Sequence, residues 1–260
     1  MTNTTIDTQK QESVFICYGK LNPNSVMGYQ YVIVEAGFYN SIQVQEFKNN
    51  NDAVFAYLSL GEVNTYSKIY ERLKMTFVGK NDNWDSFLLN LDLEKTKTVL
   101  SDTIDEFIKL GYNGIFFDNL DNFGIHGKQT AQKNSLIAFI KNMKSKYPNH
   151  LFIQNAGLEF IDLTYPLIDA VLVESVASYF DFENKTYELR SEEDFDFRLN
   201  QINTIRNQYK TPVLVVEYAN SQTRYDSIAE RLLPTAIPFF VGAIDLQTQP
   251  NFNLIPSYAF

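Results

Sequence analysis

The sequence predicts an α/β protein of the (β/α)8 class, a TIM barrel, in a single domain. Three observations support this: the chain has eight short apolar runs, amphipathic stretches with helical spacing separate most of them, and its 260 residues suit a fold that takes about 250. Strands that alternate with helices form parallel sheets. A doubly wound open sheet is the alternative, and a last apolar run close to the C-terminus favours closure.

Each apolar run has the length of a strand buried on both faces, as strands of parallel sheets are. The predicted strands are Val14–Cys17, Tyr31–Val34, Val54–Leu58, Ile115–Phe117, Leu151–Ile153, Ala170–Val173, Val213–Val216 and Ile237–Val241. A polar residue or a glycine follows every run. Because parallel strands have their carboxyl ends at one rim of a barrel, where catalytic residues lie, we expect these following residues to gather in one site.

Three stretches show the i, i+3, i+4, i+7 spacing of a helix with one buried face: residues 96–110, 130–147 and 193–209. Pro148 ends the second of these helices. Gly111 and Gly114 suit a tight turn into the fourth strand, because glycine adopts backbone angles that other residues avoid.

The first crossover of the predicted barrel is irregular. Only twelve residues separate Tyr18 from Tyr31, which leaves little room for a helix between the first two strands. We therefore expect a degenerate or missing helix there.

A long insertion is predicted between the third and fourth strands. More than fifty residues lie between Glu62 and Asp118, with a short helix expected at 65–74 and an extra strand at 87–91. The same segment contains Trp84, the single tryptophan of the chain. Because long connections in compact domains are usually functional, we expect this insertion to wall the active-site cleft.

Residues 1–12 are polar and are predicted to be a disordered lead-in, so that residues 13–260 form the one domain. This segment lacks the apolar core of a signal peptide, and no apolar run approaches the ~20 residues that a membrane span needs. As the sequence stands, a cytoplasmic location is expected. A signal or anchor trimmed from an upstream segment would instead place the protein outside the cell or at its surface.

Composition argues against several functional classes. The formal net charge is −9 and no basic patch is visible, whereas nucleic-acid-binding proteins carry a basic footprint. There is no glycine-rich phosphate loop or dinucleotide fingerprint. One cysteine, Cys17, and two histidines cannot supply a multi-cysteine or multi-histidine metal site. No metal and no cofactor are predicted, and the oligomeric state is left open.

The segment from Gly111 to Asp121 is the most informative part of the chain. Its apolar run ends at Asp118, and Asn119 and Asp121 follow at once. Period-two alternation places Asp118 on the same face of its strand as Phe116. The same alternation in the sixth strand places Glu174 on the face of Leu172, so both acids point into the cleft if these faces line the barrel.

The fourth and sixth strands are separated by one strand, so their ends lie roughly 10 Å apart at the backbone, given about 4.8 Å between neighbours. The side chains of Asp118 and Glu174 can then converge on one bond. Glycosidases need such a pair of carboxyl groups: one protonates the leaving oxygen, and the other attacks the sugar or activates water.

Five segments fall in the order typical of one enzyme family. They are Tyr57–Glu62, Gly111–Asp121, Ile153–Gly157, Val173–Glu174 and Val215–Tyr218. In this order the chain resembles glycoside hydrolase family 114, the endo-α-1,4-polygalactosaminidase-like barrels, from about Ser13 to Val241. The resemblance implies a (β/α)8 barrel that hydrolyses α-1,4-linked galactosamine-rich polysaccharide through two carboxylates, which match Asp118 and Glu174. By analogy with other α-glycosidase barrels, Asp118 is assigned as nucleophile and Glu174 as general acid/base.

The other strand ends supply a predicted set of substrate-binding residues. Tyrosines at strand ends offer a ring face and a hydroxyl together, a combination that suits sugars. The set comprises Tyr18, Tyr57, Glu62, Asp121, Asn155, Glu217 and Tyr218. We expect them to hold substrate hydroxyls or a substrate amine, and Asp121 could instead brace its loop as a turn residue.

Two alternatives remain open from the sequence. The barrel could bind carbohydrate without turning it over. It could also be a divalent-metal lyase or aldolase that uses Asp118, Asp121 and Glu174 as oxygen ligands. A Schiff-base mechanism has no candidate, because no lysine follows any of the eight runs.

Overall fold

In the computed structural model, which describes residues 13–253, eight parallel strands form one sheet. Their order around the sheet is β1-β2-β3-β7-β8-β9-β12-β13. They are β1 (Val14–Cys17), β2 (Tyr31–Val34), β3 (Ala53–Ser59), β7 (Gly114–Asp118), β8 (Leu151–Asn155), β9 (Ala170–Glu174), β12 (Val213–Tyr218) and β13 (Phe239–Gly242). The predicted lead-in over residues 1–12 lies outside the described residues.

The two edge strands, β1 and β13, approach each other and nearly close the sheet into a barrel. The rings of Phe15 and Phe240 meet edge to face across this seam, with centroids 5.4 Å apart. At the carboxyl end of β1, the amide of Tyr18 donates a 2.7 Å hydrogen bond to the carbonyl of Leu246. The predicted (β/α)8 barrel is thereby confirmed, and the open doubly wound sheet is not.

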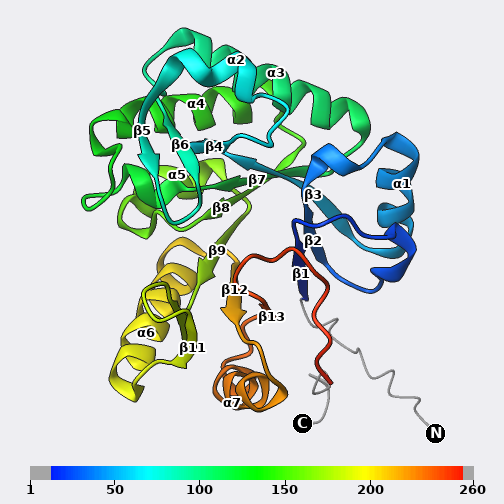
Figure 1. Ribbon diagram of the computed structural model, residues 1–260, viewed down its shortest axis with the longest axis vertical. Helices are drawn as coiled ribbons and strands as arrows, with labels where there is room; N and C mark the ends of the chain where they lie inside the picture. The colour runs from blue at the N-terminus through cyan, green and yellow to red at the C-terminus, as the bar shows by residue number, and fades with distance from the viewer. Residues whose placement is uncertain (1–12, 254–260) are drawn as a thin grey trace, which may run out of the picture.

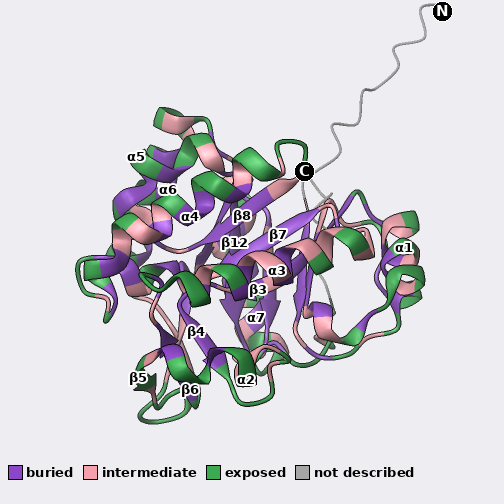
Figure 2. Ribbon diagram, turned by 90° about the horizontal axis from the view of Figure 1, so that it is seen from above, coloured by how far each residue is buried: buried purple, intermediate pink, exposed green. Residues whose placement is uncertain are grey.

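Helices form the outer layer of the molecule around the buried strands (Figure 1 and Figure 2). They are α1 (Ser41–Asn50), α2 (Tyr70–Leu73), α3 (Glu94–Leu110), α4 (Lys133–Lys146), α5 (Ile161–Thr164), α6 (Glu192–Tyr209) and α7 (Gln222–Leu232). The three predicted helices correspond to α3, α4 and α6. None of the helices within residues 13–253 has the length and apolar character that crossing a membrane requires.

Local signals explain where these helices begin and end. α1 begins with a capping box in which Asn40 and Gln43 bond each other's backbone amides. α6 and α7 begin at Ser191 and Ser221, whose hydroxyls each accept from an amide in the first turn. α3 ends at Gly111, which takes a left-handed conformation at φ 101°.

The first crossover has only the 3-10 helix Pro23–Ser25, as the short spacing predicts. The connection from β8 to β9 is also reduced, with the four-residue α5 in place of a full helix. At the start of β7, a Cβ on Gly114 would lie 2.0 Å from the carbonyl oxygen of Leu151. Gly114 is therefore required by the close approach of β7 to β8.

Two small sheets stand on the carboxyl-end connections of the barrel. The insertion after β3 folds into an antiparallel sheet of β4 (Glu62–Asn64), β6 (Ser86–Leu89) and β5 (Phe77–Asn81), in that order. After β9, the strands β10 (Ser178–Asp181) and β11 (Thr186–Leu189) form a hairpin. This hairpin has no counterpart among the predicted elements. Its two strands are short and lie between the sixth apolar run and the helix at 193–209, a segment for which the apolar pattern predicts only a connection.

Candidate active site

Asp118 and Glu174 end the strands β7 and β9, and Asn155 ends β8 between them. The side-chain nitrogen of Asn155 donates to Oδ1 of Asp118 and to Oε1 of Glu174, each at 2.7 Å. An amide NH₂ group has two hydrogens, so one nitrogen can serve both acids. The structure therefore brings the two predicted acids together through a third predicted residue.

The bridge limits how far apart the two carboxylates are. Both bonded oxygens lie 2.7 Å from one nitrogen, so their separation cannot exceed about 5.4 Å. Carboxyl groups of retaining glycosidases lie about 5–5.5 Å apart, and those of inverting enzymes about 6.5–9.5 Å apart. The two bonded oxygens are therefore closer together than the carboxyl groups of inverting enzymes.

Further donors complete the surroundings of each acid. The hydroxyl of Tyr57 donates to Oδ2 of Asp118 at 2.8 Å, and the amide of Asn119 donates to Oδ1 at 2.8 Å. The hydroxyl of Tyr218 donates to Oε2 of Glu174 in a short hydrogen bond. Asp118 thus accepts three hydrogen bonds and Glu174 two.

The chain turns sharply after each of these three strand ends. Asn119, Ala156 and Ser175 directly follow Asp118, Asn155 and Glu174, and all three adopt left-handed backbone conformations with φ of 61°, 56° and 60°. Non-glycine residues rarely take this conformation, and such strain gathers at functional sites. The repeated turn directs the backbone away from the rim and leaves the three side chains at the strand ends.

Burial is the main influence on the acid pair. It raises the pKa of Asp118, against the hydrogen bonds from Asn155, Tyr57 and Asn119. Burial also raises the pKa of Glu174, and the negative charge of Asp118 raises it further. Carboxyl groups with perturbed pKa values that share a site are typical of catalytic acid–base pairs.

Tyr18 packs beside the pair. Its ring meets that of Tyr57, with centroids 4.5 Å apart. Burial raises the pKa of the Tyr18 hydroxyl well above its ordinary value, and the charges of Asp118, Glu174 and Glu35 add to this effect. Tyr18 therefore lies within the field of three carboxylates.

Glu35 is a site residue to which the sequence reasoning assigns no role, although it directly follows the second predicted strand. It accepts a 3.0 Å hydrogen bond from the amide of Gly37, and burial raises its pKa. The positive charge of Lys68 acts in the opposite direction. The position of Glu35 after an apolar run is the signal that could have identified it.

Asp121 lies on the 3-10 helix Leu120–Phe123, directly after β7, and is exposed. Its pKa is raised, first by partial burial of the carboxyl and next by the negative charge of Asp118. The negative charge of Asp121 in turn helps to raise the pKa of Glu174. Asp121 thus stands near both acids.

The structure places Glu62 and Glu217 differently from the other predicted residues, because protein groups occupy their carboxylates. Glu62 is buried and accepts from Asn81, from Ser86 in a short hydrogen bond, and from Asn122. Its carboxylate joins the insertion sheet to the loop that follows Asp118.

Glu217 is fully buried and points toward the corner between β9 and β10. Its oxygens accept from the amides of Val176, Ala177 and Ser178 at 2.7–2.8 Å and from the hydroxyl of Ser178 at 2.6 Å. Burial raises the pKa of Glu217 to about 7, against these four donors. No carboxylate oxygen of Glu217 is left without a protein partner.

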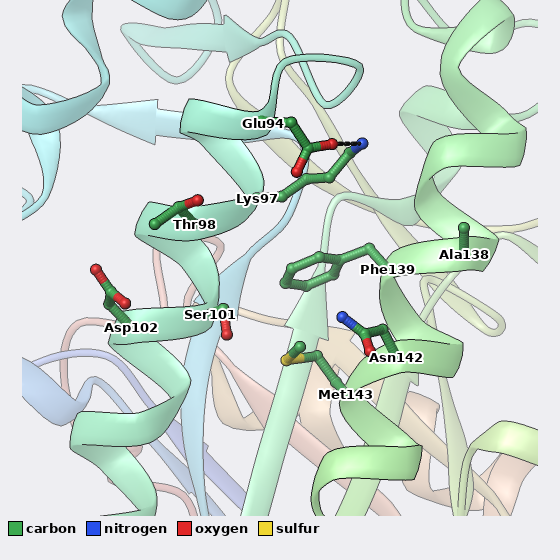
Figure 3. A pocket seen from close by; sticks show the side chains of 9 residues that line it. All are labelled: Glu94, Lys97, Thr98, Ser101, Asp102, Ala138, Phe139, Asn142 and Met143. Atoms are coloured by element: carbon green, nitrogen blue, oxygen red, sulfur yellow. Dashed lines mark hydrogen bonds and ion pairs between the residues drawn. The ribbon is translucent and has the colours of Figure 1, made fainter.

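A separate groove of about 460 Å³ lies between α3 and α4 on the helical layer (Figure 3). Glu94 and Lys97 form an ion pair at 2.7 Å on one side of it, and Phe139 and Met143 lie on the other. No residue of the acid pair or of the predicted substrate-binding set lines this groove.

Solved structures share this fold over most of the chain. The glycoside hydrolase domain of PelA from Pseudomonas aeruginosa has a TM-score of 0.80 and 24% identity, covering 91% of this chain and 96% of that one. Aspergillus fumigatus Ega3, in complex with galactosamine, has a TM-score of 0.70 and 13% identity, covering 91% and 92%. An alpha-galactosidase from Thermus thermophilus has a TM-score of 0.58 and 10% identity, covering 88% and 57%.

Among curated protein sequences, no significant match to this chain is found. The family model described as glycoside-hydrolase family GH114 matches residues 6–236, which is most of the chain, and this confirms the resemblance of the five strand-end segments. The protein belongs to glycoside hydrolase family GH114.

Proposed function

We propose that this glycoside hydrolase is an endo-acting enzyme that cleaves α-1,4-linked galactosamine or N-acetylgalactosamine-type polysaccharide with retention of configuration. Asp118 is the nucleophile and Glu174 the general acid/base. The observation that carries the proposal is the shared hydrogen bonding of both carboxylates to Nδ2 of Asn155. It limits the distance between one oxygen of each carboxylate to about 5.4 Å, which is shorter than the roughly 6.5–9.5 Å that inverting enzymes use to fit a water between acid and sugar.

The surroundings of the two acids support this division of roles. Three hydrogen bonds to Asp118 favour its charged form, which a nucleophile needs. Glu174 has two donors and the negative charge of Asp118 beside it, which favours its protonated form. An acid that keeps its proton at higher pH can donate it to a leaving oxygen.

The reaction then proceeds in two steps. Glu174 protonates the glycosidic oxygen while Asp118 attacks the anomeric carbon, which breaks the glycosidic bond and forms a covalent glycosyl-enzyme. In the second step Glu174, now ionised, takes a proton from water, and the water oxygen displaces Asp118 from the anomeric carbon. Glu174 regains its proton, and Asp118 its charge.

Additional carboxylates near the acid pair support an amino-sugar substrate. Asp121 adds negative charge that raises the pKa of Glu174, and Glu35 adds negative charge that acts on the neighbouring Tyr18. A protonated amine on galactosamine is attracted by such a cluster, whereas a neutral sugar gains nothing from it. The likeness to Ega3, solved with galactosamine, points to the same class of sugar.

The predicted substrate-binding set divides into two groups under this proposal. Tyr18, Tyr57, Asp121, Asn155 and Tyr218 surround the acid pair and contact the sugar or hold the acids. Glu62 and Glu217 act as positioning residues, because the insertion sheet and the β9–β10 corner occupy their oxygens.

The test is release of reducing ends from partially N-acetylated α-1,4-linked galactosamine polymer, with and without EDTA. Release that is insensitive to EDTA, and absent from Asp118→Asn and Glu174→Gln, supports the proposal. Release that EDTA abolishes would support the metal-dependent alternative, and binding of the polymer without release would support the non-catalytic barrel. Retention is read from the anomer that NMR detects first in the product.

A further inference from the structure

Two hairpins of the rim, distant in sequence, meet through a pair of exposed aromatic side chains. Trp84 lies in the turn between β5 and β6, and Phe182 in the turn between β10 and β11. Their rings meet edge to face, with centroids 5.3 Å apart and planes at 83°. Even so, 47% of Trp84 and 41% of Phe182 remain exposed.

Each hairpin is anchored by one of the two buried glutamates. Glu62 accepts from Asn81 and Ser86, the residues that flank the turn carrying Trp84. Glu217 accepts from Ser178, where the hairpin carrying Phe182 begins. The amide of Ile244, beyond β13, donates to the hydroxyl of Tyr187 on β11 at 3.1 Å. These bonds hold the two aromatic tips in place without covering them.

The aromatic contact lies over the sector of the rim that holds the acid pair. The insertion follows β3 and the hairpin follows β9, and β7 and β8 lie between these strands in the sheet. Asp118 and Asn155 end those two intervening strands, and Glu174 ends β9. In Figure 1 the strands β5 and β6 of the insertion and β11 of the hairpin lie on the left of the view. A polymer bound across the acids can therefore extend to Trp84 and Phe182.

The chemistry around the two rings suits an amino sugar. Phe182 also meets Phe180 edge to face, with centroids 5.1 Å apart, and the exposed parts of the Trp84 and Phe182 rings can pack against sugar C–H groups. The two turns carry Asp82, Asp85 and Glu183 against Lys185. Lys80 is paired with Asp85 at 2.7 Å and with Asp82 at 3.8 Å, and the Asp82 side chain is 90% exposed. The tips thus offer exposed aromatic surface beside three carboxylates and two lysines, which leaves one negative charge in excess.

We propose that Trp84 and Phe182 form an outlying subsite that binds a sugar unit of the polymer away from the bond being cleaved. The inference rests on the proposed function, because its occupant is an amino sugar of the same substrate chain. Two hairpins joined in this way add binding energy for long chains and leave the acid pair unchanged.

Trp84 gives a direct readout, because it is the single tryptophan of the chain. Glu174→Gln protein, which is expected to bind without turnover, is titrated with α-1,4-linked galactosamine oligosaccharides of increasing length while the tryptophan emission is recorded. We expect the emission to change with long oligosaccharides and to stay constant with galactosamine itself. Constant emission at every length, with wild-type hydrolysis intact, overturns the subsite and leaves the proposed function standing.

Steady-state kinetics provide a second, independent test of the subsite. Trp84→Ala and Phe182→Ala are expected to raise KM for the polymer at least about fivefold, and to change kcat/KM for the shortest cleaved oligosaccharide less than about twofold. Trp84→Phe, which keeps an aromatic face, should recover most of the loss. Phe197→Ala is the matched control, since Phe197 is 63% exposed on α6 and outside this contact. Equal losses on short and long substrates would overturn the subsite and make the pair a brace for the hairpins.

The two proposals fail in different ways. A length-dependent emission change in Glu174→Gln, without hydrolysis of the polymer by the wild-type protein, supports the subsite and overturns the proposed function. An equal emission change with dextran of matched length overturns the subsite's preference for amino sugars.

Discussion

Asp118 and Glu174 are held together through one atom, the side-chain nitrogen of Asn155, at 2.7 Å from an oxygen of each. Asn155 itself is only 4% exposed, and its Oδ1 is buried without a hydrogen-bond partner among the described residues. A buried acceptor without a partner is costly, so its presence at the centre of the site points to a functional demand on the amide. The spacing and the protonation of the two acids depend on the same group.

Asp118→Asn and Glu174→Gln are each expected to lower kcat by about 10²–10⁴-fold or more, because each removes a group that transfers a proton or forms the covalent bond. The double variant should be little worse than either single one, since the two acids act as a unit. Steady-state kinetics on the galactosamine polymer measure this. Hydrolysis near the wild-type rate by either single variant would remove that residue from the mechanism.

The two acids are also expected to reduce stability at neutral pH. A carboxyl with a raised pKa in the folded chain stabilises the fold below its unfolded pKa, and this contribution is lost as pH rises through the folded pKa. Asp118 and Glu174 both have raised pKa values. Asp118→Asn and Glu174→Gln should therefore melt at or above the wild-type Tm at pH 7.5, with the advantage shrinking toward about pH 4.

Thermal unfolding across this pH range provides the measurement, and Asp196→Asn on the exposed side of α6 is the control for removing a charge. Unfolding of either acid variant at pH 7.5 would instead make that carboxylate a structural group.

Asn155→Ala is expected to reduce kcat about 10²-fold, because an acid displaced by ~1 Å loses the geometry for reaction. Asn155 lowers the pKa of both acids by its hydrogen bonds, so the variant should also shift both limbs of the pH–rate profile to higher pH. Asn142→Ala, in the groove on α4, is the matched control. An unchanged profile with reduced kcat would mean that Asn155 binds substrate and does not set the protonation of the pair.

Tyr218→Phe should act on Glu174 alone. Its hydroxyl donates to Oε2 of Glu174 and lowers the pKa of that carboxyl, so its removal raises this pKa. The basic limb of kcat/KM, where the general acid loses its proton, is expected to move to higher pH while the acidic limb stays. A shift of the acidic limb alone would reverse the roles assigned to Asp118 and Glu174.

Glu217→Ala is expected to cost at least about 3 kcal/mol of unfolding free energy, because it leaves three backbone amides and a hydroxyl buried without an acceptor. Denaturant unfolding measures the loss, and Glu230→Ala on the exposed face of α7 is the control. Unchanged stability with a raised KM would show that Glu217 contacts the substrate and is not a positioning residue.

The apolar pattern by itself determined the barrel strands and the three long helices. Ile115–Phe117 is buried on both faces of its strand. Continuous apolar runs of this length are typical of strands in parallel sheets, so the composition of the run predicted a strand of this kind. The same pattern placed Asp118, Asn155 and Glu174 on one rim, because all strands of a parallel barrel have their carboxyl ends at the same rim. Helix spacing and Pro148 located α3, α4 and α6 for equally local reasons.

Tertiary structure decided which strand-end carboxylates lie beside a second acid and which are enclosed by backbone donors. Glu174 and Glu217 both end strands after an apolar run, yet one remains half-buried beside Asp118 and the other is enclosed by Val176–Ser178. The contact of Trp84 with Phe182 was equally beyond the sequence, since about a hundred residues separate them. The periodicity of a segment shows which residues share a face of one helix or strand. It does not show which distant segment supplies the hydrogen-bond partner of a polar side chain, because such segments come together only when the barrel closes.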